Sequence, residues 1–232
     1  MPISLVSRET RGDGGVRRWL PWSGIAAVIG TILVIETPWV QTAVLGTRPY
    51  ATRVFDVSSF AGWLLMAASL VGVYVIFDDQ FARLGRVSVM TTAVGMALMS
   101  VLLLRRVILF VDAGFHAIPA TGEDPAGLLL SITTVLDLAL TVIGAGGIGL
   151  ALRRSEISPT ITSQLLLLAP ILPGILIVFD QLVGLPLPVG RLLVRTNVIL
   201  VPFGLGWLAL GLRVWVYARS TSSSTAVVGN IR

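Results

Sequence analysis

A single aspartate inside a long apolar run is the residue of this chain best placed to do chemistry. Asp137 is the only charged residue of the run Ala126–Leu152. It lies roughly 17 Å along a helix that starts at Ala126, at about 1.5 Å per residue, which places it near the middle of a bilayer. A carboxylate there costs about 2.5–3.5 kcal/mol unless it is protonated, paired or in contact with internal water. Two interpretations stay open: a proton or cation site, or a structural bond to an arginine or a hydroxyl.

Further ionisable residues gather toward the same predicted half of the membrane, the outer one, whereas the inner half is predicted to be almost purely apolar. They are Glu36, Arg105, Arg106, Asp112, His116, Asp180, Arg191 and Arg195. One interpretation is a polar outer vestibule that forms a ligand or ion pathway. The other is that several of them mark the interface by snorkelling, which we favour for Arg191 and Glu36. For Asp137 or Asp180 we favour a buried ion pair with an arginine, and Arg105 and Arg106 are the candidate partners of Asp137.

The residue inventory argues against metal, cofactor and catalytic chemistry. The chain has no cysteine, which excludes disulfides and thiolate metal sites. His116 is the only histidine, so a zinc site would lack nitrogen ligands. All 17 basic residues are arginine, and the absence of lysine excludes a Schiff base and with it retinal. Known hydrolase, metalloprotease and phosphate-loop motifs are missing. We expect no cofactor, no metal and no enzymatic activity.

A glycine-rich stretch follows Asp137 on the same run. Gly144, Gly146, Gly147 and Gly149 match the G-x-G-x-x-G pattern of dinucleotide sites. That motif must follow a strand and open a helix, which this stretch does not. Small residues inside an apolar helix instead let another helix approach closely. The stretch therefore predicts a helix-packing surface, and a fourth span that is central or forms a contact between copies or with a membrane partner.

The elements that carry these residues are apolar helices. Apolar residues make up 55% of the chain and charged residues 12%, against about 25% charged in soluble domains. A span needs roughly 20 apolar residues. The runs predict an all-α bundle of six transmembrane helices: Trp19 to about Thr37, about Phe60 to Phe77, a third from Val87, Ala126–Leu152, Ile161 to about Val183, and Leu192–Tyr217. The third ends at Leu104 or continues through Arg105 and Arg106 to Val111.

The segments outside these runs define the remaining organisation. Residues 1–18 are predicted to be a basic arm, residues 19–217 the membrane domain, and residues 218–232 a disordered polar tail. A signal peptide is disfavoured because the first apolar stretch is too long for one. Trp39–Ser59 is predicted to be an outer loop, and a short interfacial helix within it stays open. Pro170 and Pro173 should kink or break the fifth helix; an ordinary kink is favoured over the discontinuous helix of a transporter.

The arginines also predict the orientation. With the N-terminus in the cytoplasm, 11 of the 17 arginines lie on the inner side and 6 on the outer side. Cytoplasmic loops carry the excess of basic residues in most membrane proteins. We therefore predict a multi-pass protein of the cell membrane with both termini in the cytoplasm. The net charge of +5 serves topology rather than nucleic-acid binding, since the arginines are scattered in pairs.

No motif is specific enough to assign the chain to a family. The function can therefore be predicted only from the general class of multi-pass membrane proteins. The favoured prediction is a non-catalytic integral membrane protein that acts as a subunit, anchor or small sensor. The alternative is a small-solute transporter, or one coupled to ions or protons, that uses Asp137 and the outer charges. An intramembrane enzyme is third. A transporter requires a wet cavity that reaches Asp137, and a structural subunit requires Asp137 to be dry and paired.

Overall fold

The described part of the chain is entirely helical. The computed structural model describes residues 14–40, 49–78, 81–112, 125–155, 160–183 and 200–229. Within these ranges the helices are α1 (Gly14–Val40), α2 (Pro49–Phe77), α3 (Arg83–Asp112), α4 (Pro125–Arg154), α5 (Thr160–Val183) and α7 (Leu200–Gly229). The predicted all-α class is confirmed at this level.

Four of these helices are long and apolar enough to cross a membrane. They contribute the stretches Asp56–Phe77, Arg83–Asp112, Ile132–Arg154 and Val201–Ser220. The apolar stretches described in α1 and α5 are shorter, Trp19–Ile35 and Ile161–Leu172. Large apolar side chains such as Val71, Val101 and Val135 are exposed on the outside of the bundle. Such surfaces fit contact with lipid tails, so the chain has the character of a membrane-embedded protein.

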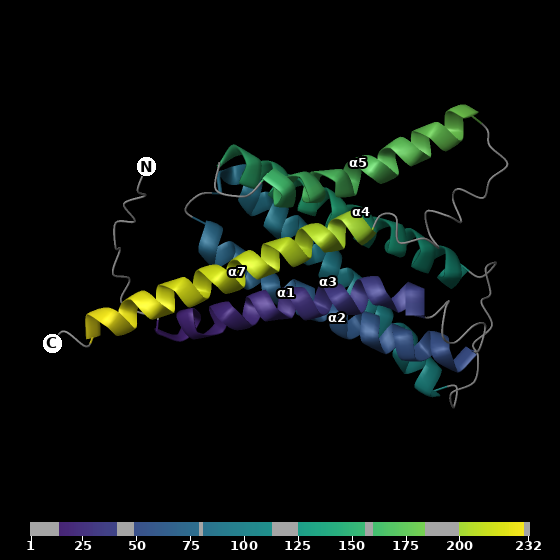
Figure 1. Cartoon of the computed structure of the whole chain (residues 1–232). Coiled ribbons are helices and arrows are strands. Elements are labelled where there is room, and N and C mark those ends of the chain that lie inside the picture. Colours follow the sequence, from purple (N-terminus) through teal and green to yellow (C-terminus); the bar gives the residue numbers. More distant parts are fainter. Residues whose placement is uncertain are drawn as a thin grey trace.

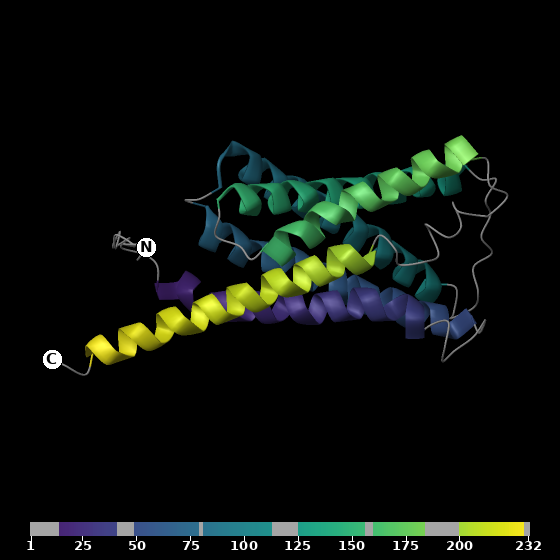
Figure 2. The ribbon, with the colours of Figure 1, turned by 45° about the horizontal axis from the view of Figure 1, so that its top comes forward.

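Each helix packs against its neighbours in a closed ring. α1 packs on α2 and α7, α2 on α3, α3 on α4, α4 on α5, and α5 on α7. The start of α1 and the end of α7 lie at the same end of the bundle, on the left of both views (Figure 1, Figure 2). The α2–α3 turn lies at this end too, and there Arg86 Nε forms a 3.0 Å ion pair with Asp78 Oδ1. We call this end the turn end.

Several helix boundaries differ from the sequence-based ones. α2 begins at Pro49 inside the predicted outer loop, and proline suits the first turn because its missing N–H has no partner there. α3 runs without interruption through Arg105 and Arg106, so the helix itself continues beyond Leu104. α7 continues to Gly229 where a disordered tail was predicted. Local apolarity locates the membrane-crossing part of a helix but not its polar extensions.

The fifth helix is not broken by its prolines. α5 covers both Pro170 and Pro173, although each removes a backbone donor. Pro170 lies against α4, where a Cβ at Gly146 would come 2.6 Å from its Cγ. Neighbouring helices can stabilise a proline-containing helix inside a membrane. The outcome is a continuous helix rather than two half-helices.

Aromatic residues dominate the core formed by α1, α2 and α7. Phe203 lies between two tryptophans, with ring centroids 6.0 Å from Trp63 and 5.6 Å from Trp207. The buried indole of Trp207 donates from Nε1 to Ser69 Oγ at 3.1 Å, and Ser69 Oγ donates to the Met66 carbonyl at 2.6 Å. The indole of Trp207 and the hydroxyl of Ser69 are therefore linked in a chain of hydrogen bonds, whereas the buried Thr31 hydroxyl of α1 has no partner. We call this core the aromatic core.

Candidate functional site

Asp137 lies where α3 and α4 cross most closely. We call the facing residues of this crossing the α3–α4 seam: Ser88, Thr92 and Gly95 of α3 with Asp137, Thr141, Gly144 and Gly147 of α4. A Cβ at Gly95 would lie 2.6 Å from the Thr141 backbone nitrogen and 2.7 Å from the Asp137 carbonyl oxygen. A Cβ at Gly144 would lie 2.6 Å from the Thr92 nitrogen. These contacts involve backbone atoms, so only glycine fits at both positions.

The seam contains buried polar atoms that have no hydrogen-bond partner. Asp137 and Thr141 are both 0% exposed. They lie one turn apart on the same face of α4, as residues four apart do. Neither carboxylate oxygen of Asp137 nor the hydroxyl oxygen of Thr141 has a partner. Buried polar groups are almost always bonded, so three unpartnered oxygens in one place require an explanation.

The other hydroxyls of the seam are satisfied within their own helix. Thr92 Oγ1 donates to the Ser88 carbonyl at 2.8 Å, and Ser88 Oγ donates to the Leu84 carbonyl at 2.7 Å. Such bonds to the preceding turn are the usual solution for a helical serine or threonine. Each hydroxyl oxygen can still accept a hydrogen bond. Together with Thr141 these residues extend a row of polar atoms from Asp137 toward the turn end.

The arginines proposed as partners do not bond to Asp137. Arg105 and Asp112 are exposed on α3, and Arg106 is half-buried. Both arginines lie about three helical turns beyond Gly95, the residue of α3 that faces Asp137. In the described part of the chain, Asp137 therefore accepts no hydrogen bond from either arginine, as its unpartnered oxygens show. The predicted buried pair with Arg105 or Arg106 is not formed in this structure.

The remaining charged residues of the predicted vestibule are placed only in part. Glu36 lies on α1 and Asp180 on α5, and for both only the backbone is described. His116, Arg191 and Arg195 lie outside the described residues. The described residues thus surround Asp137 with hydroxyls and glycines, and of the predicted charges only Arg106 acts on its carboxyl, through space and without a hydrogen bond.

The four glycines of α4 face two different helices of the same chain. Gly144 and Gly147 face α3, where a Cβ at Gly147 would lie 2.9 Å from Ser88 Cβ. Gly146 faces Pro170 of α5, and a Cβ at Gly149 would lie 2.9 Å from the Ser163 carbonyl oxygen. The chain's own helices therefore cover the glycine stretch on both sides.

Sequence reasoning missed the hydroxyls and the glycine that surround Asp137. Thr141 follows Asp137 by one turn, and Ser88, Thr92 and Gly95 share one face of α3. That spacing was readable, but uncharged serine and threonine do not interrupt an apolar run. The half of the bundle toward the turn end was accordingly predicted to be almost purely apolar. It holds the buried seam hydroxyls, together with Thr162 and Ser163 of α5.

The residues of the seam can support only a few kinds of chemistry. Within the described ranges, no group of three or more histidine, cysteine, aspartate or glutamate residues could hold a metal ion. The carboxyl of Asp137 is a buried proton acceptor, and a buried carboxylate without a partner is neutralised by a proton or a cation.

Comparison with known proteins gives no relative from which to transfer a function. No protein-family model matches the chain, and neither does any curated protein or solved structure. The described part of the chain is all-helical, with four helices long and apolar enough to cross a membrane and a buried carboxyl where two of them cross.

Proposed function

We propose that the chain is a multi-pass protein of the cell membrane, with six spans and both termini in the cytoplasm, that acts as a small non-catalytic proton sensor or proton-responsive subunit. In this account Asp137 binds and releases a proton inside the α3–α4 seam. The observation that carries the proposal is the fully buried Asp137 carboxyl, whose two oxygens have no partner.

A proton fits the seam better than a metal cation. Hard cations such as magnesium and calcium take six or more oxygen ligands. The seam offers three unpartnered oxygens, from Asp137 and Thr141. A proton needs a single oxygen, and the resulting carboxyl O–H can donate to a neighbouring hydroxyl or carbonyl oxygen. Protonation therefore removes the charge with the atoms already present.

The glycine contacts explain how a proton could change the structure. When Asp137 loses its proton, the charge must gain water or a donor, because an isolated charge is costly in an apolar interior. The backbones of α3 and α4 meet at Gly95 and Gly144, so the two helices are tightly packed at these positions. Deprotonation should therefore favour a state in which the two helices have moved apart, a population shift between two packings.

A distance measurement between α3 and α4 tests this proposal. The chain is free of cysteine, so the variant Ala82→Cys/Arg154→Cys carries spin labels only at two exposed positions near the turn end. The labelled protein in lipid nanodiscs should show a distance distribution that changes with pH. The same labels in an Asp137→Asn background should give a single distribution at every pH. An identical pH response in both backgrounds would contradict the proposal.

A proton-coupled transporter is the second candidate, favoured by the row of buried hydroxyls from Thr141 to Ser88. Such a row could pass a proton between Asp137 and the turn end once water enters the seam. Proteoliposomes that enclose a pH-sensitive dye distinguish the two functions. A transporter moves protons down a gradient in a way that Asp137→Asn abolishes, whereas a sensor gives no flux with either protein.

The proposed orientation has its own test. Reporter enzymes that are active only in the cytoplasm, fused after Arg232, should be active. If instead a reporter that functions only outside the cytoplasm is active when fused after Arg232, the result contradicts the six-span arrangement with both termini inside.

A further inference from the structure

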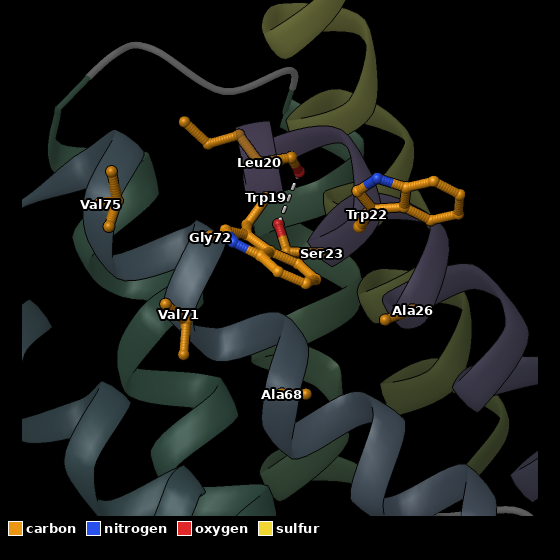
Figure 3. A pocket seen from close by; sticks show the side chains of 9 residues that line it. All are labelled: Trp19, Leu20, Trp22, Ser23, Ala26, Ala68, Val71, Gly72 and Val75. Atoms are coloured by element: carbon orange, nitrogen blue, oxygen red, sulfur yellow. Dashed lines mark hydrogen bonds between the residues drawn. The ribbon is translucent and has the colours of Figure 1, made fainter. Parts of the chain in front are cut away.

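A concave groove lies between α1 and α2, separate from the seam. It encloses about 350 Å³ and lies near the turn end. Its lining residues are Trp19, Leu20, Trp22, Ser23 and Ala26 of α1 with Ala68, Val71, Gly72 and Val75 of α2 (Figure 3). Small side chains form part of the lining, and two tryptophans stand on the α1 side.

The lining of the groove suits a hydrocarbon chain. Its one side-chain hydroxyl is already used, because Ser23 Oγ donates to the Leu20 carbonyl at 2.7 Å (Figure 3). No charged residue lines the groove. Apart from the two indole N–H groups, the lining offers a polar ligand few hydrogen-bond partners, whereas an acyl chain needs none. Gly72 contributes to the shape, since a Cβ at this position would collide with Ser23 Oγ.

The groove lies at the edge of the apolar part of α1. That stretch begins at Trp19, and the side chains of Trp19 and Trp22 are 72% and 63% exposed. Tryptophan is enriched at membrane interfaces, where its ring contacts lipid and its N–H reaches the polar headgroups. The groove therefore opens at the depth where a phospholipid changes from headgroup to acyl chain.

Positive charge adjoins this depth. Arg17 and Arg18 directly precede Trp19 on α1, and the exposed Arg83 begins α3 at the same end of the bundle. Basic residues immediately next to a transmembrane helix attract anionic lipid headgroups. The apolar slot, the tryptophans and the positions of the arginines along α1 thus follow one another in the order in which a phospholipid presents its parts.

We propose that this groove is a binding site for one anionic phospholipid, with an acyl chain between α1 and α2 and the headgroup phosphate next to Arg17 and Arg18. A second copy of the chain is the competing occupant. The lipid is favoured because a copy of this basic segment would bring arginines against arginines. The site is separate from the seam and does not depend on proton binding by Asp137.

Native mass spectrometry of the full-length protein tests the proposal with two probes of identical acyl chains, phosphatidylglycerol and phosphatidylcholine. Ala68→Phe fills the groove from an exposed position, and Val101→Phe is the matched control on an exposed surface of α3. Arg17→Gln/Arg18→Gln removes the charge and leaves the groove intact. All variants are first compared with wild type for helical content and thermal stability.

The expected result is that phosphatidylglycerol binds the wild type at least tenfold more tightly than phosphatidylcholine. Ala68→Phe should weaken the tightest phosphatidylglycerol adduct at least tenfold, and Val101→Phe should leave it unchanged. The double arginine variant should lose the preference between the two lipids. Equal binding of both lipids by the wild type would overturn the proposal. So would unchanged binding by Ala68→Phe, or a wild-type dimer that this variant dissociates.

Discussion

Two buried regions of the same bundle differ in whether their polar side-chain atoms are hydrogen-bonded. In the aromatic core, Trp207 donates to Ser69 and Ser69 donates to Met66, so the chain of bonds is complete. In the α3–α4 seam, Asp137 and Thr141 present oxygens without a partner. Thr31 is the exception near the aromatic core, where one buried hydroxyl is also unpartnered. Burying an unpartnered hydroxyl costs much less free energy than burying an unpartnered carboxyl, because only the carboxyl can become charged.

This difference in hydrogen bonding indicates that the two regions have different roles in the molecule. A core whose aromatic side chains interlock, and whose buried indole N–H is hydrogen-bonded, favours one stable packing. A seam held by glycine backbone contacts around an unsatisfied carboxyl can change its energy when one proton binds. We infer that α1, α2 and α7 form the rigid part, and that the α3–α4 seam is the responsive part.

The largest expected effect is in the aromatic core. Trp207→Ala removes a fully buried indole that packs against the Phe203 ring, and large cavities of this kind cost about 3–5 kcal/mol. Unfolding in mixed detergent micelles measures the loss. Leu205→Ala, at an exposed position of the same helix, is the control and should change stability little. Equal losses for both variants would argue against a rigid aromatic core.

A smaller but specific effect is expected at the seam crossing. Gly144→Val places a branched side chain against the Thr92 backbone, and overpacking of this kind costs about 1–3 kcal/mol. Ala97→Val, at an exposed position of α3, makes a similar addition without a clash. Unfolding measurements should separate the two variants. The spin-label distance between α3 and α4 should also increase in Gly144→Val alone, and an unchanged distance would contradict the close crossing.

A third prediction concerns the bonded hydroxyl. Ser69→Ala leaves the buried Trp207 Nε1 without an acceptor, and hydrogen bonds between membrane helices contribute about 0.6–1.7 kcal/mol. The loss should appear in the same unfolding assay. Adding Trp207→Phe to Ser69→Ala should cause a smaller further loss than Trp207→Phe causes alone, since the bond is already absent. Strictly additive losses would show that the bond contributes nothing.

The smallest effect is expected for the unbonded hydroxyl. Thr141→Val keeps the shape of the side chain and removes an oxygen that has no partner, so stability should change by less than about 0.5 kcal/mol or rise slightly. Ser69→Ala and Thr141→Val both delete one buried hydroxyl, which makes them a direct comparison of the two regions. A clear loss in Thr141→Val would show that this hydroxyl is bonded in the folded protein.

Parts of this division were accessible from the sequence. Asp137 stood out because one charge in an apolar run is costly anywhere in a membrane, and the glycines of α4 indicated close helix packing. The partners of Asp137 were not accessible, because charge alone pointed to Arg105 and Arg106. Which residues meet across two helices depends on their register and rotation. The register and rotation of α3 and α4 are set by the contacts of Gly95 with Thr141 and of Thr92 with Gly144. The sequence pattern pointed to neither Gly95 nor Thr92.

The helix ends follow a similar logic. Apolarity placed the middle of α2 and α7, since burial in lipid tails selects apolar side chains. The polar extensions of α2 to Pro49 and of α7 to Gly229 carry no such signal. The groove could not be predicted from Ala68 and Gly72 in the sequence. A small residue in an apolar helix can either allow close packing or leave an open surface.

The most direct test of the central claim is infrared difference spectroscopy of the protein in lipid nanodiscs, which follows the C=O stretch of protonated carboxyl groups during a pH titration. The account predicts a band from a protonated carboxyl in a dry environment in the wild type and in the control Asp112→Asn. That band should be missing in Asp137→Asn. A wild type without such a band at any pH, or one whose band persists in Asp137→Asn, would contradict proton binding at the seam.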